Sequence, residues 1–184
     1  SARNRAQPAL AVTSPRLVQE PGGRFGIRLP DPLWSPVEGS LPGRVAVAHG
    51  DGSRASLVWM DHMDQGLALS SATTQVLRWL QLLHEDVAWQ APAQVRLQAW
   101  DAMRIQGVRR GGAAPKAFQV HVVRVPVGLL VLRVEVPLDQ ERVRANDLER
   151  LLAGLELDPR PMQAPAGGVD ATPPAPGEIG TPNR

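Results

Sequence analysis

Cysteine and tyrosine do not occur in this 184-residue chain, and lysine occurs once. The absence of cysteine excludes disulfide bonds, thiolate metal ligands and cysteine nucleophiles. Because neither a disulfide bond nor a thiolate-bound metal ion can hold the chain together, the fold must be stabilised by burial of apolar surface. No apolar run approaches the roughly 20 residues of a membrane-spanning helix, so we expect no transmembrane segment.

The basic residues are almost all arginine, which explains an unusual charge balance. The formal net charge is only +2, although the pI is about 10.3. The pI is high because almost nothing titrates between the histidine and arginine ranges. The arginines are spread from Arg3 to Arg184, and only Arg109 and Arg110 are adjacent. Since a nucleic-acid-binding protein clusters its basic residues, we expect no nucleic-acid partner.

Composition divides the chain into three parts. Residues 1–16 contain two prolines and three arginines without apolar periodicity, which is typical of an extended arm. Residues 158–184 contain seven prolines and four glycines, a composition that cannot form a packed core. We therefore expect one domain over residues 17–157, with an arm at each end that can become ordered on a partner.

Turn residues and apolar patterns predict seven strands and two helices in residues 17–157. The first four strands form two hairpins around Gly-rich turns, and the last three form an antiparallel meander. The predicted strands are 17–18, 25–29, 44–48, 56–60, 95–108, 118–125 and 129–136. Because strands and helices do not alternate regularly, we expect the α+β class, with helices packed on an antiparallel sheet of about six to seven strands.

A long helix is predicted between the second hairpin and the meander, and a short helix after the meander. Ser70 or Ser71 can cap the long helix, which Pro92 terminates, and Asp147 can cap the C-terminal helix. Helical spacing predicts that one apolar stripe of the long helix faces the sheet. This stripe consists of Val76, Leu77, Leu80, Leu82, Leu83 and Val87.

The segment Phe25-Gly26-Ile27-Arg28-Leu29-Pro30, followed by Trp34, resembles the entrance of the PsbP/DcrB-like superfamily, where a strand of the form F-x-I-x-L-P leads to a tryptophan. The order of hairpin, long helix, three-strand meander and closing helix fits the same family over roughly residues 17–157. One departure is visible, because Pro32 is added where the family commonly has P-x-G-W. This puts the local turn before Trp34 in doubt.

The resemblance implies a non-enzymatic role and no cofactor. Members of the superfamily are accessory subunits, chaperones or small envelope proteins that bind larger proteins, and plant and cyanobacterial members bind a photosystem. For this chain the resemblance implies an accessory subunit on the extracytoplasmic, periplasmic face of a membrane-protein complex, with a photosynthetic reaction-centre complex as one such partner. A secretion chaperone or client-binding envelope protein is the alternative.

Signatures of catalysis are missing from the sequence. There is no G-x-S-x-G motif, and the histidines have no paired base nearby in the sequence. The densest polar cluster is Asp61, His62 and Asp64, whose side chains suit a divalent metal. Side chains alternate along a strand, so at most two of these ligands share a face. We therefore expect no metal site, and a metal enzyme would require these three residues to converge.

Tryptophan and arginine supply the candidate partner-binding residues. Trp34 and Trp89 lie near Pro-rich turns, and we expect them to be exposed anchors. The other three tryptophans, Trp59, Trp79 and Trp100, lie in apolar elements and are expected in the core. Arg109 and Arg110 are expected on an outer sheet face, where arginines can meet acidic partner surfaces.

Overall fold

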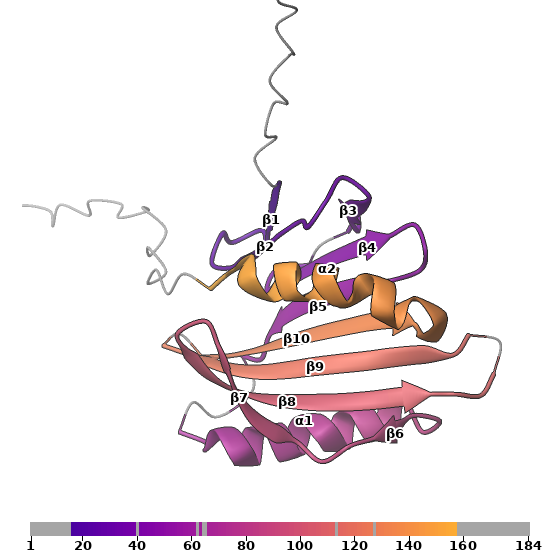
Figure 1. Ribbon diagram of the computed structural model, residues 1–184. Coiled ribbons are helices and arrows are strands. Elements are labelled where there is room, and N and C mark those ends of the chain that lie inside the picture. The colour runs from indigo at the N-terminus through magenta and orange to yellow at the C-terminus, as the bar shows by residue number, and fades with distance from the viewer. Residues whose placement is uncertain are drawn as a thin grey trace, which may run out of the picture.

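The computed structural model describes residues 16–39, 41–61, 63, 66–112, 114–126 and 128–157. These residues form two antiparallel sheets and two α-helices (Figure 1). This architecture confirms the predicted α+β class. The arms expected at residues 1–16 and 158–184 lie outside the described residues, except for Arg16.

The larger sheet has eight strands and contains the predicted meander. In spatial order its strands are β3 (Trp34–Pro36), β4 (Arg44–His49), β5 (Arg54–Trp59), β10 (Gly128–Pro137), β9 (Lys116–Val125), β8 (Trp100–Arg109) and β6 (Ala88–Trp89), and β7 (Ala93–Leu97) also pairs with β8. Every pair is antiparallel. The predicted hairpin over residues 44–60 is β4 and β5.

The smaller sheet contains the first predicted hairpin. Its strands are β1 (Leu17–Gln19), β2 (Gly26–Arg28) and β11 (Leu155–Glu156), with β2 in the middle. The turn between β1 and β2 passes through Gly23, whose φ of 70° favours glycine. β11 places the end of the described chain beside its beginning, so the two ends of the domain are held together.

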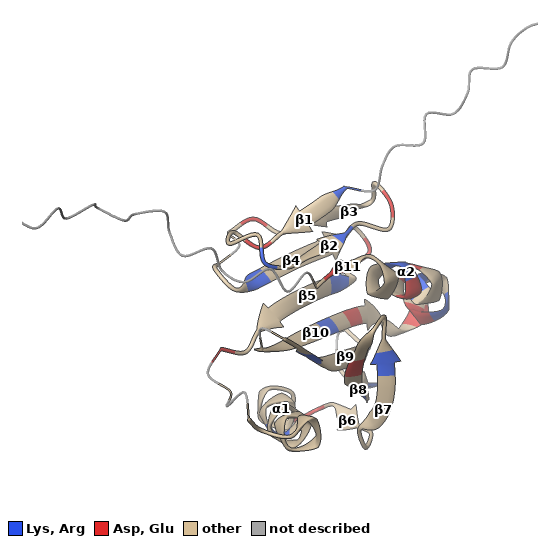
Figure 2. Ribbon diagram, turned by 90° about the vertical axis from the view of Figure 1, so that its left-hand side faces the viewer, with Lys and Arg blue, Asp and Glu red and all other residues tan. Residues whose placement is uncertain are grey.

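The helices α1 (Leu69–Leu83) and α2 (Glu141–Ala153) lie on opposite sides of the larger sheet (Figure 2). α1 packs against β8 and β9, whereas α2 packs against β10. A 3₁₀ turn, Leu138–Gln140, leads from β10 into α2. Neither of these described helices is long and apolar enough to cross a membrane.

Both helices begin before the residues expected to cap them, so the predicted caps are wrong. α1 starts at Leu69, and Ser70 and Ser71 lie in its first turn. α2 starts at Glu141, directly after the 3₁₀ turn, and Asp147 lies inside it. Asp147 is buried and uses its carboxylate in side-chain hydrogen bonds that the next subsection describes.

Strand alternation gives the larger sheet an apolar core on each side. Below α1, Val76 and Leu80 of the helix belong to a buried cluster with strand residues such as Ile105. On the α2 side, Leu151 belongs to a second cluster with strand residues such as Leu132. Neighbouring residues of one strand thus point to opposite cores, which is the pattern of a sheet covered on both faces.

The predicted strand 95–108 is wrong, because the chain reverses within it. β7 and β8 form a hairpin in which Leu97 pairs with Trp100. The turn between them contains Gln98 at a φ of 54°, a left-handed conformation that is uncommon for a residue other than glycine. The sequence gives no sign of this turn, since neither Gln98 nor Ala99 is a typical turn residue.

Candidate partner-binding surfaces

Trp34 is buried, so the expectation that it is an exposed anchor is wrong. Only 2% of its surface is exposed. Its ring contacts the imidazole of His49 edge-on, and its Nε1 donates a hydrogen bond to Oδ2 of Asp147 at 3.3 Å. The doubtful turn before it is closed by Asp31, whose carboxylate accepts a hydrogen bond from the backbone N of Leu33 at 2.7 Å. Trp34 therefore ties β3 to α2.

Trp89 is half-buried and belongs to an aromatic cluster at the end of α1. Its ring lies 5.6 Å from that of Phe118 and 6.4 Å from that of His84, measured between centroids. A Cβ atom at Gly107 would lie 2.5 Å from the Trp89 ring, so only glycine leaves room for this side chain on β8. Glycine within a strand pattern was the sequence signal for this close approach.

Arg109 ends strand β8 close to this aromatic cluster, and Arg110 follows it. The Nε atom of Arg109 lies 2.7 Å from Oδ2 of Asp86 in an ion pair, and its guanidinium lies 5.6 Å from the centroid of the Phe118 ring. Arg110 is exposed. These positions agree with an outer sheet face, and a role of either arginine in partner binding stays a prediction.

The structure describes only one of the three candidate metal ligands. His62 and Asp64 lie outside the described residues, whereas Asp61 is exposed in the loop after β5. Within the part of the chain that the structure describes, no group of three or more histidine, aspartate or glutamate side chains is arranged to hold a metal ion.

The outer side of α1 presents large apolar side chains to solvent. Trp79 is 47% exposed, Leu82 76% and Leu83 53%. The predictions that Trp79 lies in the core and that Leu82 and Leu83 face the sheet are therefore wrong. Residues three and four apart share a helix face, so these three side chains form one patch, which we name the α1 apolar patch. Exposed neighbouring apolar residues of this size are typical of contact sites.

A band of basic residues crosses the same side of the larger sheet. α1 packs on β8 and β9, and the strands beyond it carry basic side chains (Figure 2). Strand pairing places the members of this band on the face that α1 covers in part. The cationic band consists of Arg44 on β4, Arg54 on β5, Arg133 on β10, Lys116 on β9 and Arg109 on β8.

Carboxylates within the band neutralise only part of its charge. Glu135 lies 2.9 Å from Nζ of Lys116 and 2.7 Å from Nη2 of Arg133. Burial alone would raise the pKa of Glu135, but hydrogen bonds and charges of these two partners lower it below its usual range. Burial, together with Arg133 and Arg109, lowers the pKa of His84, so this imidazole adds no positive charge at neutral pH.

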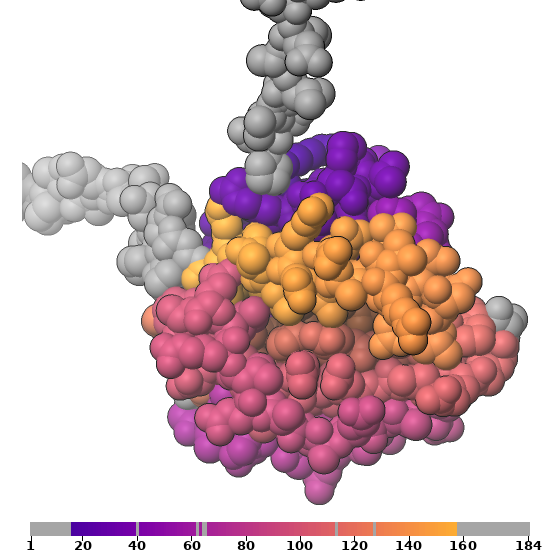
Figure 3. Space-filling view, viewed as in Figure 1, coloured from indigo at the N-terminus to yellow at the C-terminus, as the bar shows by residue number. Residues whose placement is uncertain are grey.

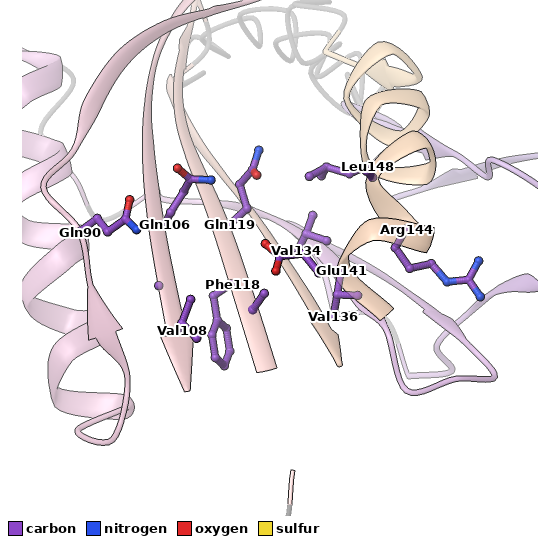
Figure 4. A pocket seen from close by; sticks show the side chains of 13 residues that line it. Gln90, Gln106, Val108, Phe118, Gln119, Val134, Val136, Glu141, Arg144 and Leu148 are labelled. Atoms are coloured by element: carbon purple, nitrogen blue, oxygen red, sulfur yellow. The ribbon is translucent and has the colours of Figure 1, made fainter. Parts of the chain in front are cut away.

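A hollow on the opposite side of the sheet lies between α2 and strands β8 and β9 (Figure 3). Its volume is about 100 Å³, which is room for a few water molecules or one small side chain. Gln90, Gln106 and Gln119 turn carboxamides toward one end, and apolar side chains such as Leu148 line the rest (Figure 4). Arg144 at its rim is already bonded to Asp51 and Asp147.

No nucleophile paired with a base lies among the described residues that line the hollow. The described side chains that line it include no serine, threonine or histidine. On the same strand face His121 is 3% exposed and lies opposite Arg104. Burial and the nearby arginine lower the pKa of His121 to about 4, so the imidazole is neutral at physiological pH. We therefore regard the α1 side, and not this hollow, as the candidate functional surface.

The sequence did not predict that the arginines of the cationic band lie together on one face. Arg109 was expected on an outer face, but Arg44 and Arg54 were not expected to lie on the same face. Only the pairing of β5 with both β4 and β10 brings Arg44 and Arg54 beside Arg133. The sequence carries no local signal for that pairing, because β5 and β10 are far apart in the chain.

Comparison with known proteins gives no match at the level of sequence families or of curated proteins. Several solved structures are similar. The solution structure of cyanobacterial PsbP (CyanoP) from Synechocystis sp. PCC 6803 superposes with a TM-score of 0.58 at 11% identity, covering 82% of this chain and 96% of CyanoP.

Two further structures are similar over most of this chain. A Bacteroides thetaiotaomicron protein superposes with a TM-score of 0.51 at 15% identity over 78% of this chain, which spans about half, 48%, of that protein. LpqN, involved in cell envelope biogenesis of Mycobacterium tuberculosis, gives 0.42 at 12% identity, covering 77% of this chain and 89% of LpqN. At the identity with CyanoP the likeness establishes the fold alone, and this chain has the PsbP-like fold that its sequence resemblance predicts.

Proposed function

We propose that this chain is a non-enzymatic accessory subunit that docks on the extracytoplasmic face of a larger membrane-protein complex. The α1 apolar patch carries the proposal, because it exposes Trp79, Leu82 and Leu83 on a helix whose other side is packed on the sheet. Tryptophan and arginine are enriched where proteins bind each other, and the cationic band lies on the same side of the molecule.

The partner that fits this side combines an apolar contact for α1 with acidic groups for the band. Apolar burial would supply affinity, whereas complementary charge would set the orientation and speed the encounter. Arg109 and Arg110 lie at the end of the band beside the aromatic cluster, and we include both in the contact. The likeness to CyanoP supports an accessory role, and a photosynthetic reaction-centre complex is the first partner to test.

Site-specific photo-crosslinking in the native host tests the proposal. A photoreactive amino acid replaces Leu82 in the α1 apolar patch, and a matched variant carries it in place of Val143 on α2, which is 62% exposed. We expect position 82 to crosslink to one or more subunits of a membrane complex and position 143 to give no such product. The products are identified by mass spectrometry after isolation of membranes.

The other results of this experiment contradict the proposal. Equal products from both positions, or none from position 82, would show that the α1 side is not a docking surface. Products from position 82 with soluble secreted proteins alone would replace the proposal with the alternative of a secretion chaperone that binds clients.

A further inference from the structure

A recess lies within the cationic band, between β3 and β10. Its volume is about 220 Å³, twice that of the hollow beside α2. The floor consists of the short side chains of Ala46 and Ser56, which lie opposite each other on β4 and β5. Arg44, Arg54, Arg133, Glu135 and Val37 surround this floor, and we name the whole the arginine recess.

Two of the three arginines in the recess are available to a ligand. Arg44 and Arg54 are exposed, and neither makes an ion pair or side-chain hydrogen bond with another described residue. Arg133 is bonded to Glu135 and lies over the Phe118 ring, so it is held in place. The recess therefore offers two unpaired guanidinium groups and one fixed group, against the single carboxylate of Glu135.

The register of the strands sets the spacing of the two unpaired arginines. Arg54 lies opposite Ala48, which is four residues along β4 from Arg44. At about 3.4 Å per residue, the two positions are roughly 13–14 Å apart along the strand direction. In an extended peptide, residues i and i+4 are separated by the same length and point to the same side.

We propose that the arginine recess binds an extended segment of the partner protein that carries two carboxylates four residues apart. The segment lies along β4, with one carboxylate on Arg44 and the other on Arg54, and the short side chains of Ala46 and Ser56 let its backbone approach the sheet. This inference rests on the proposed function, since it identifies which part of a docking partner meets the cationic band.

A carboxylate suits the unpaired guanidinium groups of the recess. A guanidinium binds a carboxylate through two parallel hydrogen bonds. Phosphate can form the same pair of hydrogen bonds with a guanidinium, so inorganic phosphate is the competitor in the experiment below.

Titration of the isolated chain with synthetic peptides tests the inference without the partner. The probe is the capped peptide Gly-Glu-Thr-Ser-Thr-Glu-Gly, and the comparison peptide Gly-Glu-Glu-Thr-Ser-Thr-Gly has the same composition with adjacent glutamates. Binding is followed by calorimetry and by NMR of the arginine Nε–H groups at low ionic strength. We expect the first peptide to bind at least about fivefold more tightly, because only it can reach both arginines.

Matched variants locate the binding. Arg44→Gln and Arg54→Gln each remove one exposed guanidinium and should weaken binding of the first peptide about fivefold or more. Arg142→Gln removes an exposed arginine from α2 on the other side of the molecule and should leave binding unchanged. Thermal unfolding of each variant verifies that the fold is retained.

Several results would overturn the inference. These are equal binding of the two peptides, unchanged binding by Arg44→Gln and Arg54→Gln, displacement of the peptide by equimolar inorganic phosphate, or binding to anionic lipid vesicles with no binding to peptide. If the peptide does not bind but position 82 still crosslinks to a membrane complex, only the proposal for the arginine recess is rejected. If the peptide binds but position 82 gives no crosslink to a membrane complex, the proposed function is rejected instead.

Discussion

Glu20 joins the first hairpin to the larger sheet through buried hydrogen bonds. Its side chain accepts one bond from the backbone N of Arg24 at 3.1 Å, one from Nε of Arg24 at 2.9 Å and one from the backbone N of Gly43 at 3.1 Å. Glu20 is 2% exposed. Although burial opposes ionisation, the hydrogen bonds from Arg24 and the backbone dominate and lower its pKa to about 2.

Replacing this carboxylate should destabilise the fold markedly. Glu20→Gln places an amide NH₂ against backbone N–H donors and leaves the Arg24 guanidinium without its counter-charge. We expect a loss of about 3 kcal/mol in the free energy of unfolding, measured with urea. Glu149→Gln changes an exposed carboxylate on α2 and should cost under about 0.5 kcal/mol. Equal stability of the two variants would contradict this role of Glu20.

Trp34 shows why single residues were predicted less well than elements. A nearby proline and a position between strands suggested exposure, but exposure depends on what covers the residue. Here α2 packs over Trp34, and Asp147 on α2 accepts the hydrogen bond from Nε1 of Trp34. Asp147 follows Trp34 by more than a hundred positions, and such long-range contacts leave no trace in local composition.

At the scale of elements, the β7–β8 turn depends on one glutamine with two tasks. Gln98 adopts a φ of 54°. Its Nε2 donates to the backbone oxygen of Leu152 at 3.1 Å, at the C-terminal end of α2, and to that of Leu155 at 2.9 Å, at the start of β11. The last carbonyls of a helix lack partners within the helix, so this side chain satisfies part of that end.

Two substitutions separate the tasks of Gln98. Gln98→Ala loses the amide bonds and keeps the left-handed strain, whereas Gln98→Gly loses the same bonds but relieves the strain. We expect the alanine variant to be less stable than the glycine variant by about 1 kcal/mol in urea unfolding. If alanine were equal to glycine or more stable, the strain assigned to this turn would be wrong.

Element prediction succeeded where strands are long or flank a Gly-rich turn. The hairpins β1–β2 and β4–β5 and the strands β9 and β10 agree with the sequence analysis. The short strands β3, β6 and β11 were missed, since two or three residues carry no periodic pattern and these strands do not form a hairpin around a Gly-rich turn. The exposure of Leu82 and Leu83 was also missed, because helical spacing predicts which side of a helix is apolar but not how much of it the sheet covers.

At the scale of the whole molecule, the candidate surface could not be predicted because it is assembled by pairing of distant strands. Composition showed arginines scattered along the chain, and that scatter argued against a basic patch. The register of β4, β5 and β10 nevertheless gathers Arg44, Arg54 and Arg133 around one recess. An even spread in sequence is therefore compatible with a local concentration of charge on one face.

The dependence of stability on pH should separate His121 and His84 from the carboxylates. The pKa of His121 is about 4 in the folded chain, lowered from 6.5 by burial and by Arg104. The unfolded chain therefore binds a proton below pH 6.5 that the folded chain binds only near pH 4, so stability falls as pH drops through this window. The slope from His121 is at most about 1.4 kcal/mol per pH unit. The lowered pKa of His84 adds to it in the same direction.

Glu20 acts in a lower window, because its pKa falls from 4.5 in the unfolded chain to about 2 in the folded one. Its contribution is complete above pH 4.5 and is lost as the pH falls toward 2. Urea unfolding between pH 7.5 and 4.5 therefore reports the histidines. We expect His121→Gln to flatten this slope, whatever its own stability at pH 7.5, and Glu20→Gln to leave the slope unchanged. An unaltered slope in His121→Gln would show that this imidazole is not held neutral by burial, and that the α2 side of the sheet is more open to water than its packing implies.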